Sequence, residues 1–285
     1  MILRWFAMTI AASSIAACSR DEAAHRRPHD ARRIVSLAPS ITEGLFAVGA
    51  ADRVVGRSRF CNFPPEARAL PIVGDVEPDL EAILELRPDL VLGIGGLTSG
   101  RLAGKLEARG IPTWFPDASS LGAIDDLLLG LGERAGHLDD AKRLVHSLDA
   151  REGAIQRSVA GEPRPRVLMA VSLAPVVAAG PKSFAGELIR AAGGDNVVDD
   201  GGAWPTIGFE RMVDLDPDIV LDATEVGTDD ITRITPKAPG WGGLRAVREG
   251  HVVPVRDERV LRAGPRIADG LAVLARALHS HAAVP

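Results

Sequence analysis

The chain has 285 residues, a hydrophobic fraction of 46% and a formal net charge of −5. This length exceeds that of one average domain, and the apolar content is sufficient for a well-buried core. Positive and negative side chains are interspersed along the chain and form no basic stripe, so nucleic acid is not expected as a partner. The chain contains no tyrosine, which excludes a haem site with a tyrosine ligand.

The first 18 residues are predicted to be an export signal. Arg4 supplies a positive charge, Trp5 to Ala12 is mostly apolar, and small residues then lead to Cys18. This order is similar to that of a bacterial lipobox, in which the cysteine is acylated and becomes the first residue of the mature protein. An ordinary signal peptide cut near Ala17 is the alternative. We expect a lipidated Cys18 and a periplasmic or extracytoplasmic protein that meets the membrane only through this anchor.

Residues 19–32 are predicted to be a tether. They carry many charges and almost no large apolar side chain, so they cannot bury enough surface to fold alone. Cys61 is the only cysteine besides Cys18. A lipidated Cys18 leaves Cys61 without an intramolecular partner, so packing rather than a disulfide has to stabilise the fold.

Two segments of the chain resemble each other at a constant spacing. Residues 79–92 and 208–221 align without gaps, 129 positions apart, and the paired residues include Glu81 and Glu210. Each copy is typical of a short helix that ends before Pro-Asp and is followed by an apolar, β-branched strand. The strand, helix and short strand predicted before each copy also correspond.

Both halves therefore alternate strands and helices, the pattern of a small, mostly parallel sheet with helices on its faces. Between them, residues 138–160 have few helix breakers and apolar residues at helical spacing, which predicts one long helix. We expect an α/β fold of two lobes, residues 33–137 and 161–285, bridged by this helix. Ligand sites in such sheets lie in loops beyond the carboxyl ends of the strands, so a ligand should bind between the lobes.

Several segments together resemble the helical-backbone class of periplasmic binding proteins, which serve ABC importers of cobalamin, ferric siderophores, haem and some metals. These segments are residues 33–43, residues 55–66, both Pro-Asp strands, Trp204-Pro205 and residues 262–267. The likeness is closest to the cobalamin-binding members. It implies a monomer with little hinge motion that captures a corrinoid and delivers it to a permease dimer with its ATPase. A ferric-siderophore binding protein of the same fold is the alternative.

The resemblance also implies which residues bind the ligand. Phe60 takes the position of an aromatic residue that packs on the ligand, Trp204 lies in the corresponding loop of the second lobe, and Arg262 takes a polar position. Aromatic rings suit the apolar faces of a corrin or chelate, and arginine donates to its amide or carboxylate edges. Further contacts are predicted where loops leave the strands, at Pro39, Ser40, Gly95 and Gly96.

Each of these residues also has a plainer interpretation. Phe60 could be a core residue, and Arg262 could form a surface ion pair with Glu258 or Asp257. Cys61, beside Phe60, is interpreted as a buried structural cysteine, with ligand contact as the alternative. Where a cobalamin binder would be expected to offer further aromatic residues, this chain has Asp75, Ile94 and Val177.

Glu81 and Glu210 are the predicted docking residues. The resemblance implies that one such glutamate at each lobe tip meets arginines of the permease dimer, and recurrence in both repeats fits a two-fold partner. The alternative is that each glutamate only complements the dipole of its helix, which contributes about 0.3–1 kcal/mol.

The sequence offers little for catalysis or metal binding. It has no G-x-S-x-G or H-E-x-x-H pattern, and its seven histidines are scattered, so neither a bare metal site nor a cofactor is expected. Residues 93–100 partly match a dinucleotide-binding fingerprint, but Thr98 occupies the third glycine position. We therefore predict no enzymatic activity. A secreted α/β enzyme and a binding module used in signalling are the alternatives from other classes.

Overall fold

The computed structural model describes residues 30–96, 99–224 and 232–285. The predicted export signal, the lipidation site Cys18 and nearly all of the predicted tether lie outside these ranges. No helix within them combines the length and the apolar character needed to cross a bilayer.

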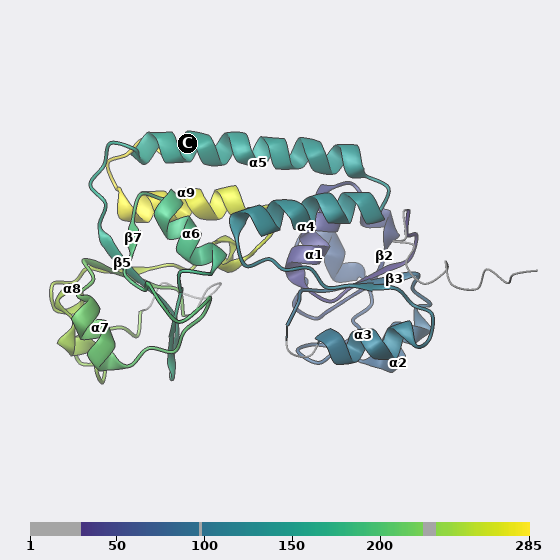
Figure 1. Ribbon diagram of the computed structural model, residues 1–285, viewed down its shortest axis with the longest axis horizontal. Helices are drawn as coiled ribbons and strands as arrows, with labels where there is room; N and C mark the ends of the chain where they lie inside the picture. Colours follow the sequence, from purple (N-terminus) through teal and green to yellow (C-terminus); the bar gives the residue numbers. More distant parts are fainter. Residues whose placement is uncertain (1–29, 97–98, 225–231) are drawn as a thin grey trace, which may run out of the picture.

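The first lobe is built on a four-stranded parallel sheet in the order β2-β1-β3-β4. Helices α1 and α4 cover one face of this sheet, and α2 and α3 cover the other (Figure 1). In β3, Leu90 and Leu92 join the core on one face and Val91 joins the core on the other, as the two-residue period of a strand requires. The elements are β1 (Ile34–Ser36), α1 (Pro39–Ala47), η1 (Ala51–Arg53), β2 (Val54–Arg57), η2 (Pro65–Ala69), α2 (Leu80–Glu85), β3 (Leu90–Leu92), α3 (Ser99–Glu107), β4 (Thr113–Trp114) and α4 (Leu121–Arg134).

The second lobe repeats this arrangement with one addition. Strands β5, β8 and β9 are parallel, and the short strand β7 pairs with the start of β5 as β2 pairs with β1. The addition is β6, which pairs antiparallel with the end of β5. The elements are β5 (Arg166–Leu173), β6 (Val176–Ala178), α6 (Phe184–Ala191), β7 (Asp195–Asn196), α7 (Phe209–Leu215), β8 (Ile219–Asp222), η3 (Trp241–Gly243), α8 (Arg245–Arg248), β9 (Val252–Pro254), η4 (Glu258–Leu261) and α9 (Ile267–Leu278).

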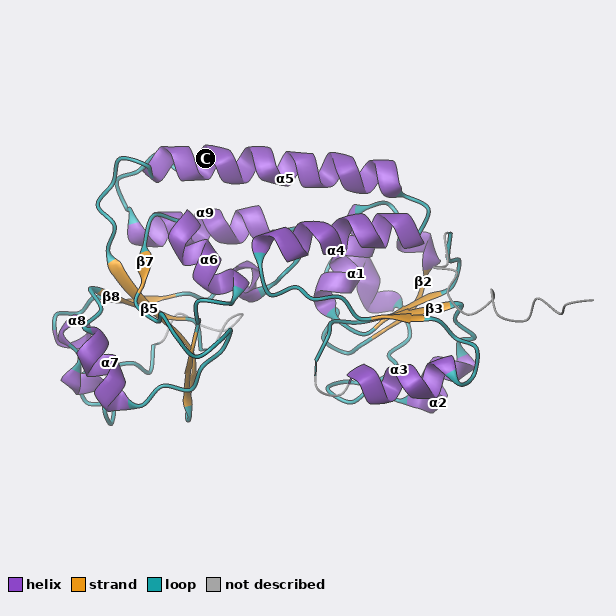
Figure 2. Cartoon of the chain, viewed as in Figure 1, coloured by secondary structure: helices purple, strands orange, loops and turns teal. Residues whose placement is uncertain are grey.

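The long helix predicted between the halves is α5 (Leu138–Val159). It runs beside α4 of the first lobe and α9 of the second, and so spans both lobes (Figures 1 and 2). Its buried residues include Leu148 and Ile155, which are seven positions apart and share one helix face. A single cluster of buried side chains continues from Leu45 in the first lobe through α4 and α5 to Leu271 in the second. The predicted two-lobed α/β fold with one bridging helix is confirmed.

Equivalent arginines make the same contact in both lobes. Arg33 directly precedes β1, and Arg166 is the first residue of β5. The guanidinium Nη2 of Arg33 donates to the carbonyl of Leu86 at 2.6 Å, and that of Arg166 donates to the carbonyl of Leu215, also at 2.6 Å. Each arginine thus ties the start of its central strand to the end of the repeated helix.

The aspartates of the two Pro-Asp segments complete this contact. Asp89 accepts a hydrogen bond from the backbone N–H of Arg33, and Asp218 accepts one from that of Arg166, both at 2.9 Å. The residues before the two prolines, Arg87 and Asp216, also share a positive φ, of 46° and 35°. The duplication inferred from the sequence is therefore a duplication of backbone geometry and of individual hydrogen bonds.

Candidate functional site

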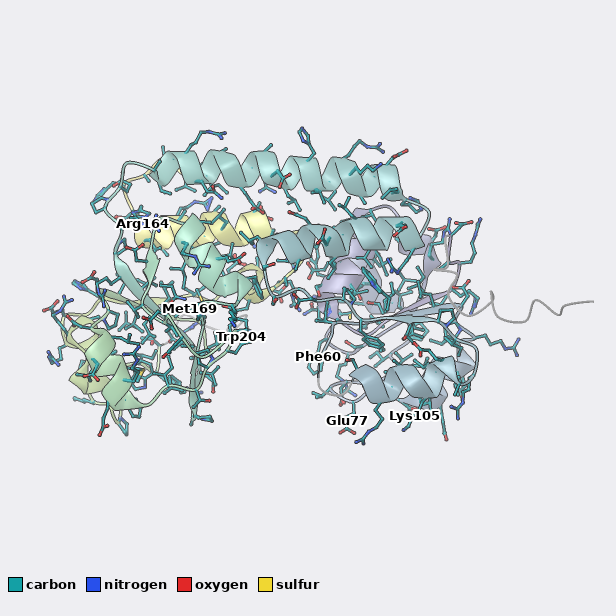
Figure 3. The ribbon with its side chains drawn as sticks, in the orientation of Figure 1. Phe60, Glu77, Lys105, Arg164, Met169 and Trp204 are labelled. Carbon is teal, nitrogen blue, oxygen red and sulfur yellow. The ribbon has the colours of Figure 1, made fainter. Side chains whose placement is uncertain are left out.

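Two exposed aromatic side chains mark the sides of the lobes that face each other. Phe60 lies in the loop after β2 and Trp204 lies in the loop between β7 and α7; both are labelled in Figure 3, one on each lobe. The exposed fraction is 50% for Phe60 and 42% for Trp204. Large apolar side chains left this accessible are candidates for ligand contact. The interpretation of Phe60 as a core residue is wrong.

The loop that carries Trp204 is fixed to the second lobe. The N–H groups of Gly180 and Ala178 donate to the carbonyls of Ala203 and Pro205 at 2.8 and 3.1 Å. The indole ring packs edge to face against Phe184, with centroids 6.0 Å apart. This geometry stabilises aromatic pairs by about 0.5–1.5 kcal/mol beyond the area they bury, so Trp204 is held in place although much of its ring remains accessible.

Arg262 belongs to a network of charges. Its Nη2 donates to Glu258 Oε2 at 2.6 Å, while Arg266 bonds both oxygens of Glu43, at 2.8 and 2.7 Å, and also Glu258 at 2.9 Å. The Nε of Arg262 lies 3.4 Å from Glu43 Oε1 but is not aligned for a hydrogen bond. The Glu43 side chain is 1% exposed. These ionic hydrogen bonds therefore connect α1 of the first lobe to the segment before α9.

This network sets the charge of its acidic members. Burial raises the pKa of Glu258, but the hydrogen bond from Arg266 and the charge of Arg262 outweigh it and hold that pKa below its usual range. The ion pair between Arg262 and Glu258, one of the two alternatives to ligand contact, is present. Contact between Arg262 and a ligand stays a prediction.

Pro39 and Ser40 do not form a turn before α1 but are its first residues. A proline is well suited to the first helical position because its missing N–H has no partner there in any case. Ser40 is 6% exposed, and a side chain at Gly264 of the second lobe would meet its Cα and Cβ at 3.4 Å. Ser40 thus lies at the contact between lobes, and its role toward a ligand stays a prediction.

Gly95 and Gly96 lie in an exposed loop after β3. The Gly95 N–H donates to the carbonyl of Pro116 at 2.9 Å, and the Gly96 N–H donates to Ser99 Oγ at 3.1 Å. Both amides therefore have partners within the protein. A side chain at Gly96 would meet no atom within 4 Å, so a ligand could approach this backbone closely.

Cys61 is buried, and its Sγ lies 3.3 Å from Ser58 Oγ. This matches its interpretation as a structural cysteine. At the three positions where further aromatic residues were expected, the structure shows half-buried Ile94 and Val177 and exposed Asp75. None of these side chains offers an aromatic ring to a ligand.

Glu81 and Glu210 lie in the first turns of α2 and α7 and are exposed. Both helices lie on the side of the sheets opposite α5 (Figure 1). Asp79 already caps α2, because its carboxylate accepts from the N–H of Glu81 at 2.9 Å. Neither glutamate forms an ion pair with any other residue that the structure describes. Their carboxylates are free to meet a partner's cations, while the helix-dipole alternative stays open.

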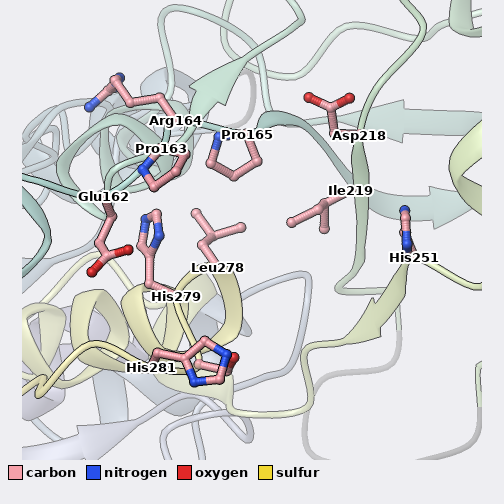
Figure 4. Close-up of a pocket in the computed structure, with 11 residues that line it drawn as sticks. Glu162, Pro163, Arg164, Pro165, Asp218, Ile219, His251, Leu278, His279 and His281 are labelled. Atoms are coloured by element: carbon pink, nitrogen blue, oxygen red, sulfur yellow. The ribbon is translucent and has the colours of Figure 1, made fainter.

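A separate pocket of about 500 Å³ lies on the second lobe and is lined by His251, His279 and His281, among others (Figure 4). Its other lining residues include Pro165, directly before β5, and Ile219, at the start of β8. The pocket is thus at the amino ends of the strands, opposite to where parallel sheets bind ligands. Within the described ranges, no three His, Cys, Asp or Glu side chains are arranged to hold a metal ion.

Comparison with known proteins decides the family. A family model described as periplasmic binding protein matches residues 34–258. The chain belongs to this family. Its members are substrate-binding proteins rather than enzymes, in line with the prediction of no enzymatic activity.

Two curated relatives and one solved structure illustrate the similarity. A vitamin B12-binding protein of Salmonella choleraesuis is 29% identical over 239 residues, which are 83% of this chain and 86% of that protein. An uncharacterised ABC transporter substrate-binding lipoprotein of Bacillus subtilis is 29% identical over 256 residues, 87% of this chain and 80% of that one. The periplasmic heme-binding protein RhuT from Roseiflexus sp. RS-1 superposes with a TM-score of 0.76 at 26% identity, covering 87% and 98% of the two chains.

Sequence reasoning missed two residues near this site. Glu43 and Arg266 fall within the segments that carry the family resemblance, but neither was assigned a role. The available signal was partial: the sequence shows that Arg262 and Arg266 are four residues apart, but the burial of Glu43 in α1 is known only from the structure. Their pairing spans 223 positions, so the local pattern could not reveal it.

Proposed function

We propose that the protein is the extracytoplasmic substrate-binding component of an ABC importer and that it binds cobalamin or a related corrinoid between its lobes. The observation that carries this proposal is the pair Phe60 and Trp204, two accessible aromatic side chains presented from facing sides of equivalent lobes (Figure 3). A corrin ring offers broad apolar faces, which aromatic rings cover well. The vitamin B12-binding relative supports the same class of ligand.

A ferric siderophore is the second candidate, and haem is less suited. The chain contains no tyrosine, and the loops that follow the strands around Phe60 and Trp204 contain no histidine. These loops therefore lack the tyrosine and histidine ligands of haem iron, and their one cysteine, Cys61, is buried with its Sγ 3.3 Å from Ser58 Oγ. A ligand whose metal is already fully coordinated, such as a corrinoid or a siderophore complex, needs no such residue.

The remaining parts of the proposal concern partners. The protein acts as a monomer, is anchored through a lipidated Cys18, and docks onto a permease dimer with its ATPase through Glu81 and Glu210. The lipoprotein relative supports the anchor. The two unpaired carboxylates at repeat-equivalent positions support docking to a partner with two-fold symmetry.

The test is titration of the mature protein with cyanocobalamin, cobinamide, ferrichrome and haemin, read by calorimetry and by quenching of tryptophan fluorescence. We expect cyanocobalamin or cobinamide to bind, and Phe60→Ala and Trp204→Ala each to weaken binding about tenfold or more, since each removes buried apolar area. Val76→Ala, at an 80% exposed position, is the control. Binding of ferrichrome alone would favour the second candidate, binding of haemin alone would contradict the argument against haem, and binding of none of these ligands would reject both proposed classes of ligand.

A further inference from the structure

Arg57, the last residue of β2, is a buried cation without an acidic partner. Its exposed fraction is 6%, and no carboxylate within the described ranges lies at ion-pair distance from its guanidinium. A buried charge is costly unless it is paired or fully hydrogen-bonded. The Nε of Arg57 is buried and has no hydrogen-bond partner, so the acceptors of its two terminal nitrogens must stabilise the charge alone.

All of these groups are main-chain carbonyls of one loop. Nη1 of Arg57 donates to the carbonyls of Ser58 and Arg59, at 3.1 and 3.3 Å, and Nη2 donates to that of Arg68 at 2.9 Å. The acceptors stand at both ends of residues 58–68, which we call the aromatic loop because it carries Phe60 and Phe63. The guanidinium fork thus joins the two ends of this loop.

The contacts of Arg57 limit the shapes that the aromatic loop can take. Any shape that withdraws one of the three carbonyls leaves this buried charge, whose Nε already has no acceptor, with one acceptor fewer, which costs more than the loss of an ordinary hydrogen bond. The Phe60 ring cannot hold the loop itself, since half of its surface is exposed. A second contact comes from the other lobe, where the Arg266 guanidinium lies 3.9 Å above the centroid of the Phe63 ring.

We propose that Arg57 is a positioning residue for ligand binding, which acts by holding the aromatic loop so that Phe60 meets the ligand. This inference rests on the proposed ligand site at Phe60. Arg57 touches no ligand. It lowers the conformational entropy that the aromatic loop loses when a ligand binds, an effect known as preorganisation. A lysine can replace it only in part, because a single ammonium group lacks the planar fork that reaches three carbonyls.

A double-mutant cycle with cyanocobalamin tests this inference. We expect Arg57→Met to raise the Kd about tenfold in the wild-type background and less than about twofold in a Phe60→Ala background, because Arg57 acts through Phe60. Arg57→Lys should fall between wild type and Arg57→Met. Arg134→Met is the matched control: Arg134 is also buried, over the Trp114 ring, and its loss should lower stability without changing the Kd. Equal effects of Arg57→Met in both backgrounds would overturn the proposal.

A second measurement needs no ligand. Within the aromatic loop, the N–H groups of Cys61 and Ala67 donate to the carbonyls of Ser58 and Pro64. When Arg57 is replaced by Met or Lys, hydrogen exchange at these two N–H groups should accelerate at least about tenfold. Exchange in α4 should stay unchanged. If the loop exchanges as slowly as in wild type, Arg57 does not hold it and the inference fails. If the Arg57 variants exchange faster as expected but the wild-type protein binds no corrinoid, the proposed ligand is wrong while the role of Arg57 in the loop stands.

Discussion

Replacing Glu152 on α5 by glutamine should stabilise the protein at alkaline pH. Burial, together with the charges of Asp125 and Asp149, raises the pKa of Glu152 to about 7. Burial and the charges of Asp149 and Asp126 likewise raise the pKa of Asp125, on the adjacent helix α4, to about 6. Carboxylates of like charge therefore meet where α4 packs on α5, and ionising all of them opposes that contact.

The sign and size of the effect follow from these values. Because the pKa of Glu152 is higher in the folded than in the unfolded chain, its contribution to stability is most favourable below pH 4.5 and is lost as the pH rises toward 7. The full change from 4.5 to about 7 corresponds to about 3 kcal/mol. Partial exposure screens this figure to about 1–2 kcal/mol. Glu152→Gln should therefore gain about that much at pH 8 and almost nothing at pH 4.5.

Urea unfolding at pH 4.5, 6 and 8, followed by circular dichroism, measures this difference. Glu85→Gln, at an exposed position of α2, is the control and should change stability little at any pH. A gain that is the same at all three pH values would show that glutamine improves packing instead. A loss of stability at pH 8 would refute the like-charge reasoning outright.

Three further outcomes are expected. Charge reversal of both Glu81 and Glu210 to lysine should abolish uptake in cells while the Kd for ligand stays within about twofold; normal uptake would remove the docking role. Glu43→Gln should lower the unfolding free energy by about 2–4 kcal/mol in urea titrations, because it leaves Arg266 partly unpaired in a buried place, and a change below about 0.5 kcal/mol would contradict that. Cys18→Ala should release the protein from the membrane fraction, an outcome that cell fractionation decides.

Much of the fold could be predicted because the sequence contains the same pattern of helix and strand in both halves. The two copies of helix and strand, 129 residues apart, occupy α2 and β3 in one lobe and α7 and β8 in the other. The pattern did not predict β6, since three residues between a proline and a glycine-containing loop carry too weak a strand signal. Pro39 and Ser40 were expected in a loop that leaves a strand, but they begin α1, because the fixed φ of proline suits the first helical position.

The site was predicted only in part. Phe60 and Trp204 were identified through the family resemblance, and both are accessible in the structure. The roles of Arg57 and Glu43 could not be predicted, because each depends on residues distant in the sequence and leaves no local pattern. Arg57 looks like the polar end of a strand until the folded loop brings the carbonyl of Arg68 to it, and Glu43 looks like an ordinary helical glutamate.

The buried core that continues through α4, α5 and α9 has a consequence for selectivity. Densely packed interiors deform little, so this shared core resists a rotation of one lobe against the other. For the ligand proposed to bind at Phe60 and Trp204, adjustment to a thicker or thinner molecule would then fall to the two loops that carry these rings and not to the lobes.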